Sequence, residues 1–241
     1  MSQPDYRQTE WETNLTGEIL ILRLISKILY TEPEPDWIAE LSEPGLFNEA
    51  PFAMNQPDVV TGLQQLARWS NVMRSAENED RLLDLRIDYT QLLVGGNEFT
   101  TPPWESVYFN EDRMLFQKET LEVRAWYRRF GLAAEKQGRE PDDHIALELS
   151  FLAHLASLAL EACHAEDWER YEELMTAQRD FLSAHVLRWA PDWCDLMMLH
   201  ARTDFYHGTA FLLRGVLTEL ELLYGAQPTG TGFDGITIGT C

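Results

Sequence analysis

The sequence predicts an all-α protein, a single helical domain of about eight to ten helices. Two observations support this fold class. Apolar residues recur three and four positions apart in most segments before Gly225, which is the period of a helix. No segment shows the sustained alternation of apolar and polar residues that is typical of a strand. The chain has 241 residues, 45% of them hydrophobic, which is enough for one sizeable core.

The N-terminal part contains two predicted helices and an irregular segment. An apolar stripe predicts a helix over residues 11–30, which the TEPEP sequence ends. A short helix is expected at 36–41, with Asp36 as its N-cap. Residues 42–56 are rich in turn-forming residues, so we expect no regular structure there.

Two further helices are predicted between Pro57 and Gly96. Pro57 suits the first turn of a helix. We expect the buried stripe of that helix to be Val60, Leu63, Leu66 and Met73. The next helix begins near Asp80 and ends at Gly95 and Gly96. Its apolar positions are Leu82, Leu85, Tyr89, Leu92 and Leu93.

Residues 95–108 interrupt the helical pattern. This segment, GGNEFTTPPWESVY, holds two glycines, two prolines and three aromatic residues without a regular period. Such a composition predicts either a packed loop or a binding loop. Helices resume near Asn110 and run to a C-cap at Gly131.

The C-terminal half is predicted to hold the centre of the domain. A helix over 141–165 is apolar on most of its circumference, so it belongs in the core. Helices at 167–188, 192–201 and 204–224 follow, and they complete a helical domain over 1–224. The small, turn-rich residues 225–241 predict a flexible tail.

The charge balance favours basic partners. Asp and Glu number 40 against 19 Lys and Arg, a formal net charge of -21. Nucleic acid and anionic membrane surfaces are repelled by such a chain. The alternative is a general acidic surface that serves solubility. The N-terminus does not read as a secretory signal, and the apolar runs are interrupted by His or Glu, so we expect no membrane span.

Motifs of common enzymes and metal sites are absent from the sequence. It has no P-loop, no GxGxxG after a strand and no GxSxG elbow. Its three cysteines are far apart and form no CxxC pair, which suits a reducing cytoplasm. Glu161 and His164 form one Glu-x-x-His unit, but a di-iron bundle needs two. His144 and Glu148 lie one helical turn apart, and two ligands do not complete a metal site.

The sequence EPDDH at 140–144 has two competing interpretations. Glu140 as N-cap, Pro141 at the first helical position and acids in the first turn would explain everything except the histidine. The other interpretation is a site for a basic ligand, in which Asp142 and Asp143 supply charge and His144 responds to what binds.

Three linked motifs resemble the TorD/DmsD family, the dedicated cytoplasmic chaperones of molybdoenzymes exported by the twin-arginine pathway. The first is Tyr89 followed by Leu92 to Gly95, and the second is Pro103, Trp104, Ser106 and Tyr108. The third is Glu140, Pro141, Asp143 and His144. Their order and approximate spacing agree with the family, and the resemblance covers roughly residues 15–224.

The resemblance implies an all-α chaperone without catalysis and without a cofactor. Its partners would be the apo catalytic subunit of a molybdopterin oxidoreductase and its twin-arginine signal peptide, held until cofactor insertion and before export. It would act in the cytoplasm as a monomer or homodimer, without binding nucleic acid. The implied leader-peptide-binding residues are Tyr89, Leu92, Trp104, Ser106, Tyr108, Glu140, Pro141, Asp143 and His144.

Within that implied role, the acids of EPDDH would meet the arginines of the leader, and the Trp104 loop would supply apolar contact. Glu105 departs from the pattern, because some relatives carry glycine there. Two alternatives stay open. One is an assembly factor of the nitrate-reductase type whose client is not exported. The other is a metal-dependent helical-bundle enzyme that uses Glu161 and His164.

Overall fold

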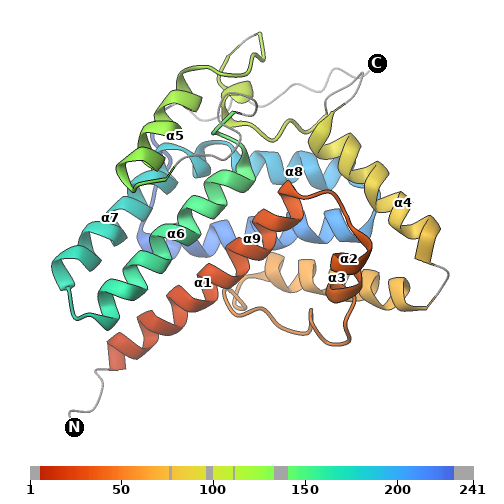
Figure 1. The fold of residues 1–241 in the computed structure, drawn as a ribbon, viewed down its shortest axis with the longest axis horizontal. Helices are drawn as coiled ribbons and strands as arrows, with labels where there is room; N and C mark the ends of the chain where they lie inside the picture. Colours follow the sequence, from red (N-terminus) through yellow and green to blue (C-terminus); the bar gives the residue numbers. More distant parts are fainter. Residues whose placement is uncertain (1–5, 76–77, 96–99, 111, 133–140, 231–241) are drawn as a thin grey trace.

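The structure confirms the all-α prediction. It is a computed structural model that describes residues 6–75, 78–95, 100–110, 112–132 and 141–230. Those residues form nine α-helices and no strand (Figure 1). The helices are α1 (Tyr6–Tyr30), α2 (Pro35–Leu41), α3 (Pro57–Arg74), α4 (Asn78–Tyr89), α5 (Lys118–Arg129), α6 (Ile145–His164), α7 (Trp168–Ala184), α8 (Ala190–His200) and α9 (Asp204–Tyr224). A π-helical turn (Thr90–Val94) and 3₁₀ turns (Glu105–Tyr108 and Val186–Arg188) lie between them.

Helices α6 and α9 form the centre of the domain. Helix α1 packs along α6 and α3 packs along α9, while α7 covers α6 and α8 covers α9 (Figure 1). Ser26 of α1 donates a hydrogen bond to the carbonyl of Ala146 at 2.7 Å, which fixes the first turn of α6 against α1. Helix α6 alone among the described residues has the length and hydropathy of a membrane span. Since 61% of that window is buried inside the structure, a core helix accounts for it.

A buried carboxylate fastens the end of α4 to the start of α9. Asp88 accepts hydrogen bonds from the backbone nitrogens of Arg202 and Thr203 and from the Thr203 hydroxyl, the last at 2.7 Å. Thr203 in turn caps α9. Because Asp88 precedes Tyr89, this anchor also fixes where the first of the three motifs lies.

Helices α3 and α9 approach so closely that glycine is required at their contact. A Cβ atom on Gly62 would lie 2.6 Å from the carbonyl oxygen of Gly208, and one on Gly208 would lie 2.9 Å from that of Gly62. Real side chains do not tolerate such contacts, so both positions must remain unsubstituted for these helices to pack as they do.

Most predicted helices are present, with shifted boundaries. Helix α2 begins at Pro35 after the N-cap Glu34, so the assignment of Asp36 as the cap is wrong. In α3 the buried position is Val59, whereas the predicted Val60 is exposed. Helix α5 starts at Lys118 rather than near Asn110, whose side chain instead bonds to the backbone nitrogen and carbonyl of Met114.

The predicted tail is docked at its beginning. Ala226 is fully buried, and the backbone nitrogens of Gln227 and Thr229 donate hydrogen bonds to Ser183 at 3.1 and 2.8 Å. Ala226, Gln227 and Thr229 thus pack on the end of α7, and the flexibility expected from Gly225 onward stays a prediction. Residues 231–241 lie outside the described part of the chain.

The close contact at Gly62 predicts that replacing this glycine by alanine destabilises the protein. In a free helix Gly62→Ala would stabilise by up to about 1 kcal/mol, because alanine is the better helix former. Here we expect a loss of about 1–3 kcal/mol, since the new methyl group forces α3 away from α9. Thermal unfolding measures the change, and Thr218→Ala at an exposed position of α9 is the control. A Gly62→Ala variant as stable as the wild type would contradict the close approach.

Candidate functional site

Two of the three motifs are joined by their backbones. The backbone nitrogen of Ile145 donates to the carbonyl of Pro103 at 2.8 Å, and that of Glu105 donates to the carbonyl of Asp143 at 3.0 Å. These bonds form an isolated antiparallel bridge between Trp104 and His144. The segment before α6 therefore pairs with the loop before the 3₁₀ turn at Glu105–Tyr108.

The acids of EPDDH are buried, which corrects the helix-start interpretation. Helix α6 begins at Ile145, so Pro141, Asp142 and Asp143 precede it, and Glu140 lies outside the described residues. Pro141 is buried, and Asp142 and Asp143 are fully buried. In place of the predicted first helical turn, Asp142 and Asp143 form a non-helical turn and His144 is extended, because the backbone groups of Asp143 and Ile145 bond to the Trp104 loop.

Each buried acid has an internal partner. The Asp143 carboxylate accepts a hydrogen bond from the backbone nitrogen of Ser106 at 2.7 Å. The Asp142 carboxylate accepts from Arg124 Nε at 2.6 Å, and the Tyr127 hydroxyl donates to the Asp142 carbonyl at 3.0 Å. An arginine does meet this motif, but it is the chain's own arginine on α5.

His144 is the N-cap of α6. Its Nδ1 accepts a hydrogen bond from the backbone nitrogen of Ala146 at 3.1 Å, so Nδ1 carries no proton in this arrangement. The ring meets Tyr30 and Trp104 edge to face, with centroids 5.4 and 5.8 Å apart. The helix-start interpretation left this histidine unexplained. In the structure it caps α6 and also packs against the rings of Tyr30 and Trp104.

The first motif joins the same place through Tyr89 and Leu92. The Tyr89 hydroxyl donates to the carbonyl of Tyr30 at 3.0 Å. The hydroxyl of Thr101, ahead of the Trp104 loop, donates to the carbonyl of Leu92 at 2.5 Å. All three predicted motifs thus meet in one region. Tyr30, Tyr89 and Trp104 are only partly buried there, so we call these three residues the ring surface.

The remaining predicted residues of the loop face inward. Ser106 is fully buried, and Tyr108 stacks on Trp189 with its hydroxyl donating to the carbonyl of Pro102 at 2.7 Å. Leu92 is buried as well. Burial raises the pKa of Tyr108 above its ordinary value, so its hydroxyl stays protonated. These side chains hold the loop in place rather than face solvent.

Glu105 lies at the centre of a buried polar cluster. It is fully buried, 2.9 Å from His185 Nδ1 and 3.6 Å from Arg188 Nη1. Burial raises the pKa of Glu105, and the hydrogen bond to His185 opposes that shift. Where some relatives carry glycine, this chain has an acid, and its partners His185 and Arg188 come from the segment that follows α7.

Glu148 of α6 is a second buried acid in this cluster. Burial raises the pKa of Glu148 well above its ordinary value, and the neighbouring carboxyl groups of Glu105 and Asp143 raise it further. The raised pKa favours the neutral form of Glu148. A neutral acid costs much less to bury than a carboxylate does, which explains how three acids share one buried region.

Several residues of this region were not predicted from the sequence. Tyr30, Arg124, His185 and Arg188 lie on other helices and turns, far along the chain from the motifs. No spacing rule connects them to EPDDH, because only the packing of α1, α5 and α7 brings them there. Glu148 alone had a sequence signal, since it lies four residues after His144.

The proposed metal ligands do not come together. Glu161 and His164 are exposed at the end of α6, and His164 contacts Glu12 at 3.9 Å. Within the described ranges, no group of three or more His, Cys, Asp or Glu side chains has a metal-binding arrangement. Cys163 and Cys194 are both buried.

The sequence and the structure are similar to those of several known proteins. The family described as nitrate reductase delta subunit matches residues 56–195. A chaperone protein TorD from Aliivibrio fischeri is 26% identical and covers 77% of this chain and 86% of its own. A probable Tat proofreading chaperone DmsD from Haemophilus influenzae is 27% identical over 83% of this chain and 88% of its own. A crystal structure from Archaeoglobus fulgidus covers 90% of this chain and 97% of its own at 19% identity, with a TM-score of 0.46.

The buried acids predict how stability depends on pH. Unfolded glutamate has a pKa of about 4.3. Because the folded pKa of Glu148 is higher, folding takes up a proton between the two values, and stability decreases as pH rises through that range. Glu18 of α1 is buried against α9, and burial raises its pKa to about 8. Its contribution to stability therefore also decreases as pH rises.

We therefore expect wild-type stability to fall between pH 5 and pH 8, with Glu18 contributing on the order of a few kcal/mol to the fall. Denaturant unfolding at both pH values measures this. Glu148→Gln and Glu18→Gln should each show a smaller fall than the wild type, because the amide cannot ionise. Equal pH dependence in all three proteins would show that these groups ionise normally in the folded state.

The Asp143 hydrogen bond predicts a structural role for that acid. Asp143→Ala leaves the buried nitrogen of Ser106 without an acceptor, so we expect a loss of about 1–3 kcal/mol in stability. The loss should be the same at low and high salt, because a buried contact is screened little. Asp180→Ala, at an exposed position of α7, is the control. A loss that disappears at high salt would place Asp143 at the surface.

Proposed function

Because this chain belongs to the nitrate reductase delta subunit family and is similar over most of its length to TorD and DmsD chaperones, we propose that it is a maturation chaperone. Its client is the apo catalytic subunit of a molybdopterin oxidoreductase. It binds the twin-arginine leader of that subunit in the cytoplasm and holds the subunit until its cofactor is inserted and before export. It catalyses no reaction.

The observation that carries this proposal is the bridge between Trp104 and His144. It sets the Trp104 ring against the buried His144, whose ring also contacts Tyr30, and Tyr89 joins them through its hydrogen bond to the Tyr30 carbonyl. Partly exposed aromatic side chains on a fixed scaffold suit the apolar stretch of a leader, because rings bury large apolar areas with little loss of side-chain entropy.

We propose two roles for the predicted residues, which differ in burial. Tyr89 and Trp104 contact the leader directly. The other predicted residues are buried and hold the ring surface in place from inside the protein: Leu92, Ser106, Tyr108, Pro141, Asp143 and His144. Glu140 stays a candidate contact and lies outside the described residues.

The leader's arginines then require exposed acids near the ring surface. Glu32 and Glu34 follow Tyr30 directly and expose 58% and 62% of their side chains. Both contact Arg86, at 3.5 and 3.6 Å, and exposed pairs at such distances are weak. An arginine of the leader can replace Arg86 at little cost, and a guanidinium binds carboxylates in two-point contacts.

The family description favours a second candidate client. Nitrate reductase delta subunit is the description of the matching family, and a client of that type need not be exported. Such an assembly factor would use the same ring surface for an N-terminal segment without paired arginines. Titration with leaders that carry or lack the arginine pair separates the two candidates.

The ring surface predicts a binding variant. Trp104→Ala should weaken binding of a synthetic twin-arginine leader about tenfold or more, as expected when an aromatic contact is removed. Its thermal stability should change little, because the ring is partly exposed. Trp168→Ala on α7, where the ring is 47% exposed, is the matched control and should bind normally. Trp104→Ala that binds normally would remove Trp104 from the site.

The acids predict a salt effect that is separate from the ring contact. The double variant Glu32→Gln and Glu34→Gln should bind the leader more weakly at low salt and resemble the wild type at high salt, because exposed charge pairs are screened. Glu169→Gln with Glu172→Gln on α7 makes the same charge change elsewhere and should have no effect. If the control pair weakens binding equally, binding depends only on the net charge of the protein, and Glu32 and Glu34 do not contact the leader.

A further inference from the structure

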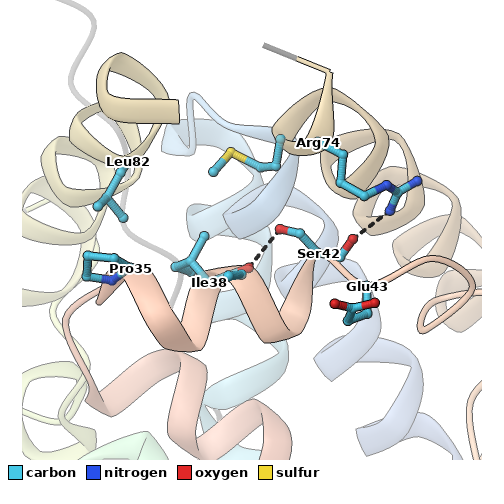
Figure 2. Close-up of a pocket in the computed structure, with 8 residues that line it drawn as sticks. Pro35, Ile38, Ser42, Glu43, Arg74 and Leu82 are labelled. Atoms are coloured by element: carbon cyan, nitrogen blue, oxygen red, sulfur yellow. Dashed lines mark hydrogen bonds between the residues drawn. The ribbon is translucent and has the colours of Figure 1, made fainter. Parts of the chain in front are cut away.

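Apart from the ring surface, the protein has a pocket between α2, α3 and α4 (Figure 2). We call it the α2 pocket. Its volume is about 380 Å³, within the range of ligand-binding pockets. Pro35, Ile38 and Ala39 of α2, Met73 of α3 and Leu82 of α4 give it apolar walls.

The walls of the α2 pocket are fastened together. The Ser42 hydroxyl donates to the carbonyl of Ile38 at 2.7 Å (Figure 2). The Ser42 carbonyl accepts hydrogen bonds from the Ser70 hydroxyl at 3.0 Å and from Arg74 Nη1 at 2.6 Å. These bonds join the end of α2 to the last turns of α3, so the pocket is formed without a ligand and binding needs little reorganisation.

The charge around the α2 pocket is negative. Glu43 lines the pocket, and Asp36 and Glu40 lie next to its wall on the exposed side of α2. Asp36 and Glu40 share a face of α2, because they are four residues apart, and Glu43 follows the end of that helix. No ion pair to these three acids occurs among the described residues.

The cation at the pocket is already engaged inside the protein. Arg74 donates hydrogen bonds to Ser42, Ser70 and Asn71. Its guanidinium is therefore committed to holding α3 against the end of α2. A ligand that enters the α2 pocket meets apolar walls and the Glu43 carboxylate, with Asp36 and Glu40 exposed on the adjoining face of α2.

We propose that the α2 pocket is a docking site for a basic segment of a partner protein, which inserts a large apolar side chain between flanking Lys or Arg residues. The apolar side chain fills the cavity, and the flanking cations pair with Asp36, Glu40 and Glu43. This site goes beyond the proposed leader site. Leu82 and Tyr89 are seven residues apart on α4, about 10 Å along the helix, so the two sites are neighbours but do not coincide.

The test uses a blocked peptide, acetyl-Arg-Arg-Leu-Leu-Arg-Arg-amide, titrated by calorimetry into the full chain. Ala39→Trp fills the cavity from an exposed position of α2, so it should reduce affinity about tenfold or more without lowering the melting temperature. Glu40→Gln with Glu43→Gln should reduce affinity at low salt only. Glu161→Gln with Glu172→Gln makes the same charge change on exposed parts of α6 and α7 and should bind as the wild type does.

Two further peptides separate docking from attraction between opposite charges. Replacing both leucines by serine should abolish binding, and so should replacing the arginines by glutamate. If the serine peptide binds as tightly as the leucine peptide, the acidic surface alone attracts it and the inference is wrong.

The Trp104→Ala variant keeps this inference independent of the proposed function. It should bind the hexapeptide as the wild type does. Loss of binding in Trp104→Ala, together with normal binding in Ala39→Trp, would place the peptide on the ring surface and overturn the α2 site while leaving the leader site in place. Loss of leader binding with normal hexapeptide binding would support both sites.

Discussion

The hydrogen bonds that join Pro103 to Ile145 and Glu105 to Asp143 constrain the rest of the site. Neither segment is helical there, and most residues of both are buried, so their backbone polar groups cannot bond to water. Each segment supplies the donors and acceptors that the other lacks. Once they are paired, Trp104 and His144 must lie side by side, and α6 must begin at Ile145.

That constraint explains the acids around His144. Asp143 is placed where it satisfies the nitrogen of Ser106, and Asp142 where it meets Arg124. Burial also brings Glu105 and Glu148 near Asp143, and three carboxylates in one buried region repel one another. The raised pKa of Glu148, which favours its neutral form, and the contacts of Glu105 with His185 and Arg188 both reduce this repulsion. A motif that looks like a charged surface is the inner support of a site.

In this arrangement, the residues that hold the site rigid differ from the residues proposed to contact the client. The buried residues fix the ring surface, whereas the contacts of the proposed site come from partly exposed rings and from exposed acids that follow α1. A chaperone must release its client, so weak exposed charge pairs combined with a preformed apolar surface suit that task. The α2 pocket repeats this pattern, with a fastened apolar cavity bordered by unpaired carboxylates.

The sequence by itself determined the helical fold, because apolar residues spaced by three and four specify a buried helix face wherever they occur, as in α1 and α6. It also determined which motifs belong together, since Tyr89, Trp104 and His144 do meet in one region. Only the tertiary structure decided what those residues do. Whether Asp143 faces solvent or Ser106 depends on a partner 37 positions away, and no local propensity reports such a contact. The start of α6 was misplaced for the same reason: Pro141 and the acids favour a helical first turn locally, but pairing with the Trp104 loop satisfies more buried polar groups and prevails.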